Sequence, residues 1–204
     1  TRFTDYNGRM CMVSAGAANY RSFGIDRAPN PLFDVAMAHT VMVLGANVPE
    51  TFPVYIRWFW EAIDRGATLI CVDPRETSLA RVAQLHLPIR PGTDGALLNA
   101  MLHVVIREEL VADEFVANHT TGFDDVAASV QAWTPERAGE VCGIDPDLIV
   151  RAALAFGRAE RAILSHARGM EHQVMGSRNA MAAINLCLAT GNIGRAGAGY
   201  GTIT

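Results

Sequence analysis

Three short segments of the sequence combine a turn-forming Gly or Pro with acidic or amide side chains, and each follows an expected strand. They are GANVPET (45–51), DPRET (73–77) and RPGTD (90–94). In the first, Gly45, Asn47 and the start of a helix offer unpaired N–H groups to a phosphate, because a helix N-terminus attracts anions. In the second, Asp73 could accept hydrogen bonds from a ribose hydroxyl or a base edge, and Arg75 could pair with phosphate. One such segment alone is typical of an ordinary turn, but three in succession predict a nucleotide-like ligand.

The sequence also limits which nucleotide site this can be. It contains no GxGxxG, which disfavours a standard NAD site, and it has no lysine, which excludes a P-loop.

Cys11 is the candidate nucleophile or metal ligand. It lies two residues after Arg9 and directly before a small-residue helix expected over 13–19. A helix N-terminus and a nearby guanidinium both favour the thiolate form, which suits metal binding; the alternative is a buried structural cysteine. The sequence has no CxxC, which argues against a zinc knuckle or a self-contained iron–sulfur cluster. The remaining cysteines are assigned to packing: Cys71, Cys142 and Cys187.

A fourth segment with candidate residues follows the last expected strand, 161–166. There His166 and His172 flank Arg168. The chain has no HExxH zinc motif, but the position after a strand places this segment on the ligand side of a sheet. Arg168 and His172 are therefore added to the candidates.

Short apolar runs alternate with helical patterns, and this alternation predicts the fold class. Continuous apolar runs are typical of strands buried on both faces. We expect strands over 41–46, 68–72, 85–89 and 161–166, and helices over 50–65, 77–83, 93–110 and 177–189. Such alternation predicts an α/β fold, a doubly wound and mainly parallel, Rossmann-like sheet with helices on both faces. In these sheets, ligands bind beyond the carboxyl ends of the strands.

Residues 112–160 show helical patterns only. Thr134-Pro135 and Asp145-Pro146 are expected helix starts, because Pro favours the first helical position after a capping side chain. We expect this stretch to be a helical insert at one side of the sheet. The whole of 1–204 is expected to be a single domain, an internal part of a larger protein.

The composition bounds the classes of function. The chain has 204 residues, of which 50% are hydrophobic and 19% charged, enough to bury a substantial core. No apolar run approaches the roughly 20 residues that span a bilayer. The net charge of −4 gives no electrostatic reason to bind nucleic acid. We expect neither a nucleic-acid partner nor a membrane.

Five collinear segments resemble the molybdopterin oxidoreductase family, whose members hold molybdenum between two molybdopterin guanine dinucleotides. They are the Cys11 region, GANVPET, VDPRET, LHLPIRPGTDGALLNAMLHVVIREEL and ARGMEH…NLCLATGNIGRAGAGYG. The resemblance implies that Cys11 is the protein ligand to molybdenum and that this domain binds one of the two dinucleotides. The positions that it implies as cofactor contacts are Asn7, Gly45, Asn47, Glu50, Thr51, Asp73, Pro74, Arg75, Gly92, Thr93, Asp94, Arg168 and His172.

Met12 bears on the reaction within this family. Formate dehydrogenases of this family usually have His directly after the metal-binding residue, whereas nitrate reductases have Met, as this sequence does at position 12. The segments DYNGRMCM and RAGAGYGTIT are most similar to those of the assimilatory nitrate reductases. The resemblance thus implies two-electron reduction of nitrate to nitrite, with Cys11 and Met12 at the catalytic centre. A formate dehydrogenase of the same family and a non-catalytic nucleotide-binding module are the alternatives. One departure is His172-Gln173, where relatives tend to carry Gln-His.

The resemblance also implies groups and partners beyond these residues. The cofactors would be molybdenum bis(molybdopterin guanine dinucleotide) and, upstream of Thr1, a [4Fe–4S] cluster. The partners would be the remaining domains of the same catalytic subunit, an electron-donor protein or subunit, and a small oxyanion substrate. The expected location is cytoplasmic, and the isolated chain is expected to be inactive.

Overall fold

The computed structural model describes residues 8–203, and at their centre lies a five-stranded sheet in which neighbouring strands are parallel. The strands are β1 (Thr40–Leu44), β2 (Thr68–Val72), β3 (Leu85–Leu87), β4 (Ala162–His166) and β5 (Gly199–Thr202). Their order, β3-β2-β1-β4-β5, matches the first five strands of the doubly wound order 3-2-1-4-5-6. The predicted α/β fold with a parallel sheet is confirmed. The winding reverses between β1 and β4, which leaves a crevice beyond their carboxyl ends.

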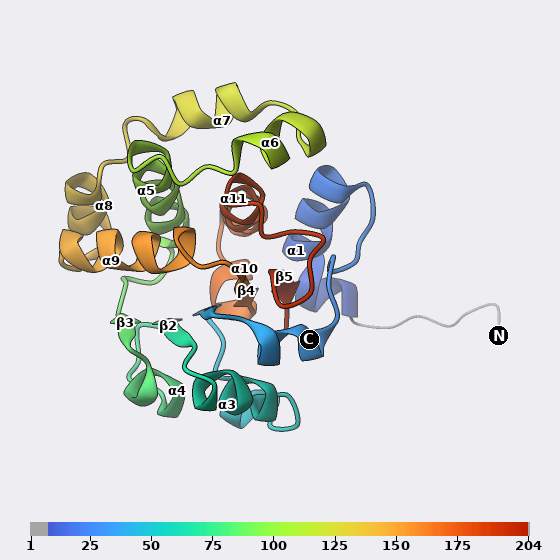
Figure 1. The fold of residues 1–204 in the computed structure, drawn as a ribbon. Coiled ribbons are helices and arrows are strands. Elements are labelled where there is room, and N and C mark those ends of the chain that lie inside the picture. Colours follow the sequence, from blue (N-terminus) through green and yellow to red (C-terminus); the bar gives the residue numbers. More distant parts are fainter. Residues whose placement is uncertain (1–7, 204) are drawn as a thin grey trace.

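Helices cover both faces of this sheet (Figure 1). Side chains of successive strand residues point to opposite faces. The elements that cover the faces are η1 (Leu32–Met37), α3 (Ile56–Asp64), α4 (Ser78–Val82), α5 (Asp94–Arg107), α9 (Pro146–Gly157) and α11 (Gly176–Ala189). On one face Met42, Ile70 and Leu164 belong to a core shared with α5, α9 and α11. On the other face, Val43 and Leu69 pack with η1, α3 and α4.

Four helices and no strand occupy residues 112–160, as the sequence predicts: α6 (Asp113–His119), α7 (Phe123–Val130), α8 (Pro135–Cys142) and α9. The side chains of Thr134 and Asp145 accept hydrogen bonds from the first-turn backbone N–H groups of α8 and α9, so both predicted helix starts are confirmed. In Figure 1 these helices lie on the same side of the sheet as α5.

Several predicted elements need correction. The helix predicted over 50–65 is two helices, α2 (Val48–Thr51) and α3. Pro53 lies between them, and proline lacks the N–H that a continuous helix requires. The helix predicted to reach residue 110 ends at Arg107, and Glu109 has a positive φ of 55°. Three short elements were not predicted: η1, α10 (Arg168–Glu171) and β5.

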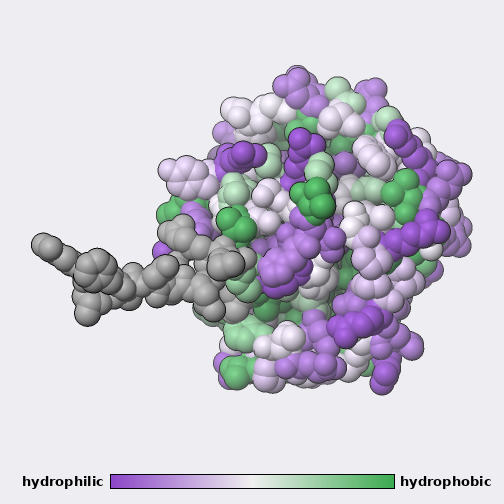
Figure 2. Space-filling model, turned by 180° about the vertical axis from the view of Figure 1, so that it is seen from behind, coloured by the Kyte–Doolittle hydropathy of each residue, from purple (hydrophilic) through white to green (hydrophobic). Residues whose placement is uncertain are grey.

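The surface mixes polar and apolar side chains. Figure 2 shows the face opposite to that of Figure 1, where apolar side chains stand in separate groups among polar ones. The most exposed large apolar residues include Val13, Tyr20, Val54 and Val174. Among residues 8–203, no helix combines the length and apolar character needed to cross a membrane.

Candidate functional site

A cavity of about 460 Å³ lies beyond the carboxyl ends of β1, β2, β4 and β5. This volume falls within the usual range of small-molecule sites, and its position is the crevice at which doubly wound sheets bind ligands. All three predicted loops contribute to its lining. The candidates that line it are Gly45, Asn47, Thr51, Asp73, Pro74, Arg75, Asp94 and Arg168.

Two glycine backbones touch at the point where the loops after β1 and β4 meet. The N–H of Gly169 donates to the carbonyl of Gly45 at 3.0 Å. Gly45 has a φ of +56°, and a Cβ placed there would come within 2.6 Å of the backbone nitrogen of Met170. Since a Cβ on Gly169 would come equally close to Gly45, only glycine fits at either position. This contact holds the two loops together at the cavity wall.

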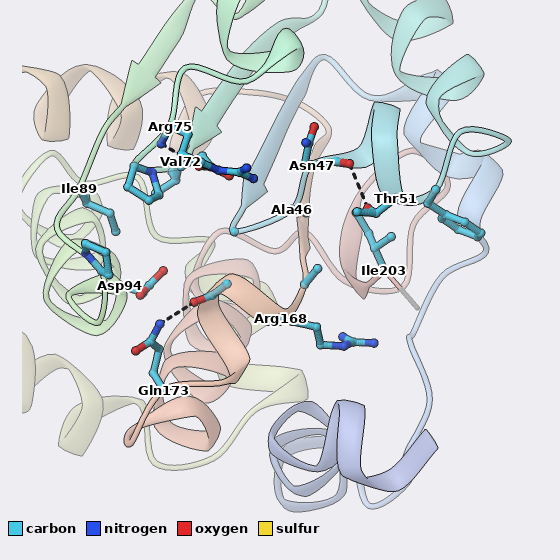
Figure 3. A pocket seen from close by; sticks show the side chains of 17 residues that line it. Ala46, Asn47, Thr51, Val72, Arg75, Ile89, Asp94, Arg168, Gln173 and Ile203 are labelled. Carbon is cyan, nitrogen blue, oxygen red and sulfur yellow. Dashed lines mark hydrogen bonds and ion pairs between the residues drawn. The ribbon is translucent and has the colours of Figure 1, made fainter. Parts of the chain in front are cut away.

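Asn47 and Thr51 lie on one side of the cavity, and Asp94 and Gln173 on the other (Figure 3). The Thr51 hydroxyl donates to the carbonyl of Asn47 at 2.9 Å. The side-chain oxygen of Asn47 is buried and has no hydrogen-bond partner within the described part of the chain. Because buried polar groups are nearly always paired, this oxygen is available to a ligand with an N–H or O–H donor.

Asp73 and Arg75 form the β2 side of the cavity. Asp73 Oδ1 accepts the backbone N–H of Arg75 at 2.8 Å, so this carboxylate shapes the turn that it belongs to. The Nε of Arg75 lies 3.7 Å from the same oxygen, and the Arg75 side chain remains 69% exposed. Such a side chain retains donors for a phosphate or a carboxylate.

Asp94 begins α5 and is buried, with 5% of the residue exposed. Burial raises the pKa of Asp94 to about 6, because a low-dielectric environment disfavours the charged form. A buried carboxylate at the cavity wall can accept two parallel N–H groups, such as those of a base edge.

We expect Asp94→Asn to stabilise the chain at pH 7 by about 1–3 kcal/mol, at about 1.4 kcal/mol for each unit of pKa change. With a folded pKa of about 6 and an ordinary value of 3.8, the folded chain keeps a proton that the unfolded chain releases between those values. Stability contributed by Asp94 is therefore lost as the pH rises from about 4 to 6. Urea denaturation at pH 4 and pH 7 measures this difference, which should vanish at pH 4.

Asp125→Asn is the matched control for this experiment, since Asp125 also lies in the first turn of a helix but is exposed. It should change stability by no more than about 0.5 kcal/mol at either pH. Equal effects of Asp94→Asn at pH 4 and pH 7 would contradict the raised pKa.

Cys11 is exposed and lies on α1 (Gly8–Phe23). The backbone of α1 is non-helical at Met12 (φ −122°, ψ 23°), so a first turn that ends at Cys11 precedes the main helix. The sequence predicts the main helix but not this first turn. Cys11 is expected before the helix, but it lies at the end of this additional first turn. The other three cysteines are buried, as predicted.

Two side chains from beyond β4 contact Cys11. The Nε of Arg168 donates to Cys11 Sγ at 2.8 Å, and His172 Nε2 lies 2.8 Å from the carbonyl oxygen of Cys11. Arg168 lines the cavity and extends from it toward α1 (Figure 3). Cys11 is thereby connected to the cavity. Residues 8–203 contain no group of three or more His, Cys, Asp or Glu side chains placed to hold a metal ion.

Some sequence candidates do not line the cavity: Glu50, Gly92, Thr93 and His172. The hydroxyl of Thr93 donates to the carbonyl of Arg90 at 2.6 Å. The Thr93 side chain makes no cap for α5, although Thr is a common capping residue. Met12 is half-buried at the irregular point of α1, and Asn7 lies outside the described residues. Their roles toward a cofactor stay predictions.

Nine lining residues were not among the candidates: Ala46, Phe52, Val72, Ile89, Pro91, Ala167, Gly169, Gln173 and Ile203. Ala46 and Pro91 lie inside the predicted segments 45–51 and 90–94. The other apolar residues carry no signal that separates a cavity wall from a core. Gly169 and Gln173 lie in the segment already marked by Arg168 and His172, so their position beside these candidates was a usable signal.

Known proteins share the sequence family and the fold of this chain. The family model described as "Molybdopterin oxidoreductase" matches residues 1–204, and the chain belongs to the molybdopterin oxidoreductase family. The resemblance seen in the sequence is confirmed.

Similar proteins differ in their reactions. The chain is 36% identical over 205 residues to the assimilatory nitrate reductase catalytic subunit of Bacillus subtilis (strain 168), covering 100% of this chain and 29% of the relative. It is 38% identical over 199 residues to the F420-dependent formate dehydrogenase subunit alpha of Methanocaldococcus jannaschii, covering 98% and 30%. The structure of acetylene hydratase from Pelobacter acetylenicus superposes with a TM-score of 0.85 at 28% identity, over 93% of this chain and 26% of the other. The chain thus spans about three tenths of the length of these curated relatives.

Proposed function

We propose that this chain binds one molybdopterin guanine dinucleotide and supplies Cys11 as a ligand to molybdenum, within a protein that reduces nitrate to nitrite. The observation that carries the proposal is the meeting of three loops in one cavity whose wall residue Arg168 contacts the exposed sulfur of Cys11. The proposal includes a [4Fe–4S] cluster and an electron donor outside residues 1–204.

The residues present fit such a group. The unpartnered oxygen of Asn47 and the carboxyl of Asp94 would accept hydrogen bonds from the nucleotide, and the guanidinium of Arg75 would pair with its phosphates. Gly45 has no side chain, so the loop after β4 can pack directly against it at the cavity wall. A cysteine thiolate is a soft ligand suited to a transition metal. When bound, the molybdenum group supplies two-electron redox chemistry.

The protein's own side chains position the thiol. His172 contacts the carbonyl of Cys11 while Arg168 contacts its sulfur, so residue 11 is restrained at both backbone and side chain. Such support around a ligand fixes its orientation and is commonly worth about 10- to 100-fold in metal affinity or activity.

Two observations support nitrate as the substrate. Met12 follows Cys11, and the nitrate reductase relative from B. subtilis matches the whole chain. The second candidate is formate oxidation, which the 38% identity to a formate dehydrogenase subunit favours. The exposure of Cys11 beside the cavity counts against a non-catalytic module, for which this thiol would have no role.

The test uses the full-length protein purified with its molybdenum and assayed with viologen dyes in both directions. Nitrate-dependent oxidation of reduced dye is the expected result. Formate-dependent reduction of oxidised dye, without nitrate activity, would replace the first candidate with the second. Neither activity in a molybdenum-containing preparation would contradict both.

A further inference from the structure

Arg168 joins three elements that are distant in the sequence. Its Nε donates to the sulfur of Cys11 on α1 at 2.8 Å. One of its terminal nitrogens donates to Glu171 Oε1 at 2.7 Å and to the hydroxyl of Thr202, on β5, at 3.2 Å. The planar guanidinium is thus held along two edges, which a flexible lysine ammonium could not reproduce.

The partner that holds Arg168 is itself fixed. The side chain of Glu171 is fully buried, and its Oε1 accepts the hydroxyl of Thr202 at 2.8 Å and lies 3.2 Å from His166 Nδ1. His166 Nε2 lies in turn 2.6 Å from the Tyr200 hydroxyl. Glu171 therefore sits in a network that ties α10 to β4 and β5.

The charge of Glu171 is preserved in this setting. Burial by itself raises the pKa of the carboxyl, but the His166 ring 3.2 Å away, the hydrogen bond from Thr202 and the nearby charge of Arg168 outweigh it and leave the pKa below its ordinary value. A buried carboxylate thus faces one edge of the guanidinium while the sulfur of Cys11 faces another. The side chain of Arg168 remains 23% exposed.

We propose that Arg168 is a positioning residue for Cys11 that also makes the surroundings of its sulfur attract small anions. The guanidinium holds the sulfur by a hydrogen bond, and its fixed positive charge raises the local concentration of anions over cations. The substrate class that this favours is a small oxyanion or carboxylate. The inference rests on the proposed function in one point, namely that the substrate binds beside Cys11.

A pair of thiol reagents of opposite charge tests this in the full-length protein prepared without molybdenum. Anionic sulfonatoethyl methanethiosulfonate and cationic trimethylammonioethyl methanethiosulfonate both react with a thiolate, which forms a mixed disulfide and releases methanesulfinate. The ratio of their rates cancels the amount of thiolate and reports the local charge. Cys71, Cys142 and Cys187 are buried, and peptide mass spectrometry follows the modification of Cys11 itself.

We expect Arg168→Met to lower the anionic-to-cationic rate ratio by about tenfold at low ionic strength, since a unit charge a few ångströms away acts in opposite directions on the two reagents. Arg168→Lys should retain most of the wild-type ratio because it keeps the charge. Arg75→Met is the matched control: it removes the other guanidinium that lines the cavity and should change the ratio by less than about twofold.

A ratio in Arg168→Met that equals the wild-type ratio, or that changes no more than in Arg75→Met, would overturn the proposal. Cooperative urea unfolding shows that each variant is folded; the midpoint of Arg168→Met should fall, because the buried carboxylate of Glu171 loses its ion pair. Since the measurement contains no molybdenum, its outcome is independent of the viologen assay, and failure of either leaves the other interpretable.

Discussion

Cys11→Ala is expected to reduce the molybdenum-dependent activity of the full-length protein by at least about a hundredfold. Removing a residue that only supports a ligand already costs about 10- to 100-fold, and the proposed role of Cys11 is that of the ligand itself. The thiol is exposed on α1, so the substitution should change the free energy of unfolding by no more than about 0.5 kcal/mol. A large loss of activity in a protein of unchanged stability is the expected combination.

Activity, molybdenum content and urea unfolding should be measured together on this variant. Val13→Ala is the matched control, because Val13 lies two residues further along α1 and is 60% exposed. The control should keep both its metal and its activity. A Cys11→Ala protein that retains molybdenum and full activity would exclude the ligand role and favour a different metal ligand.

The strands of this fold could be predicted because they are continuous apolar runs that end in turn residues. β2 has the predicted bounds 68–72, and β1 differs from prediction only at its ends. β5 could not be found in this way: its sequence, Gly-Tyr-Gly-Thr, contains two glycines, which disfavour an isolated strand. It is a strand because β4 offers it an edge to pair with, from Ile163 to His166. Tertiary pairing decides such segments.

The site, like the sheet, has a part that the sequence could predict and a part that it could not. The loops around Asn47, Asp73 and Asp94 could be predicted to converge, since carboxyl ends of parallel strands share one edge of the sheet. The contact between Arg168 and Cys11 joins residues 157 positions apart and has no local pattern. It depends on the four-residue helix α10, which places Arg168 and Glu171 three residues apart on neighbouring positions of one face.

The second large effect is expected from Gly45→Ala, which should destabilise the chain by about 2–4 kcal/mol. Alanine at a φ of +56° carries a backbone cost of about 1–2 kcal/mol. Its Cβ would also lie 2.6 Å from Met170 N and 2.8 Å from the backbone of Gly169, and overpacking of this kind costs about 1–3 kcal/mol. Backbone atoms cannot rotate away, so the loops after β1 and β4 would have to separate. Urea denaturation followed by tryptophan fluorescence measures the change.

Gly66→Ala separates the two contributions. Gly66 also has a positive φ, +91°, but a Cβ there would meet nothing within 4 Å, so its loss of about 1–2 kcal/mol would report backbone strain alone. The excess loss in Gly45→Ala then measures the contact with Gly169. If the two variants lose the same stability, the two loops are not in contact in solution. If the excess is found, the same variant of the full-length protein should also bind less molybdenum cofactor, because the cavity wall that these glycines build would be displaced.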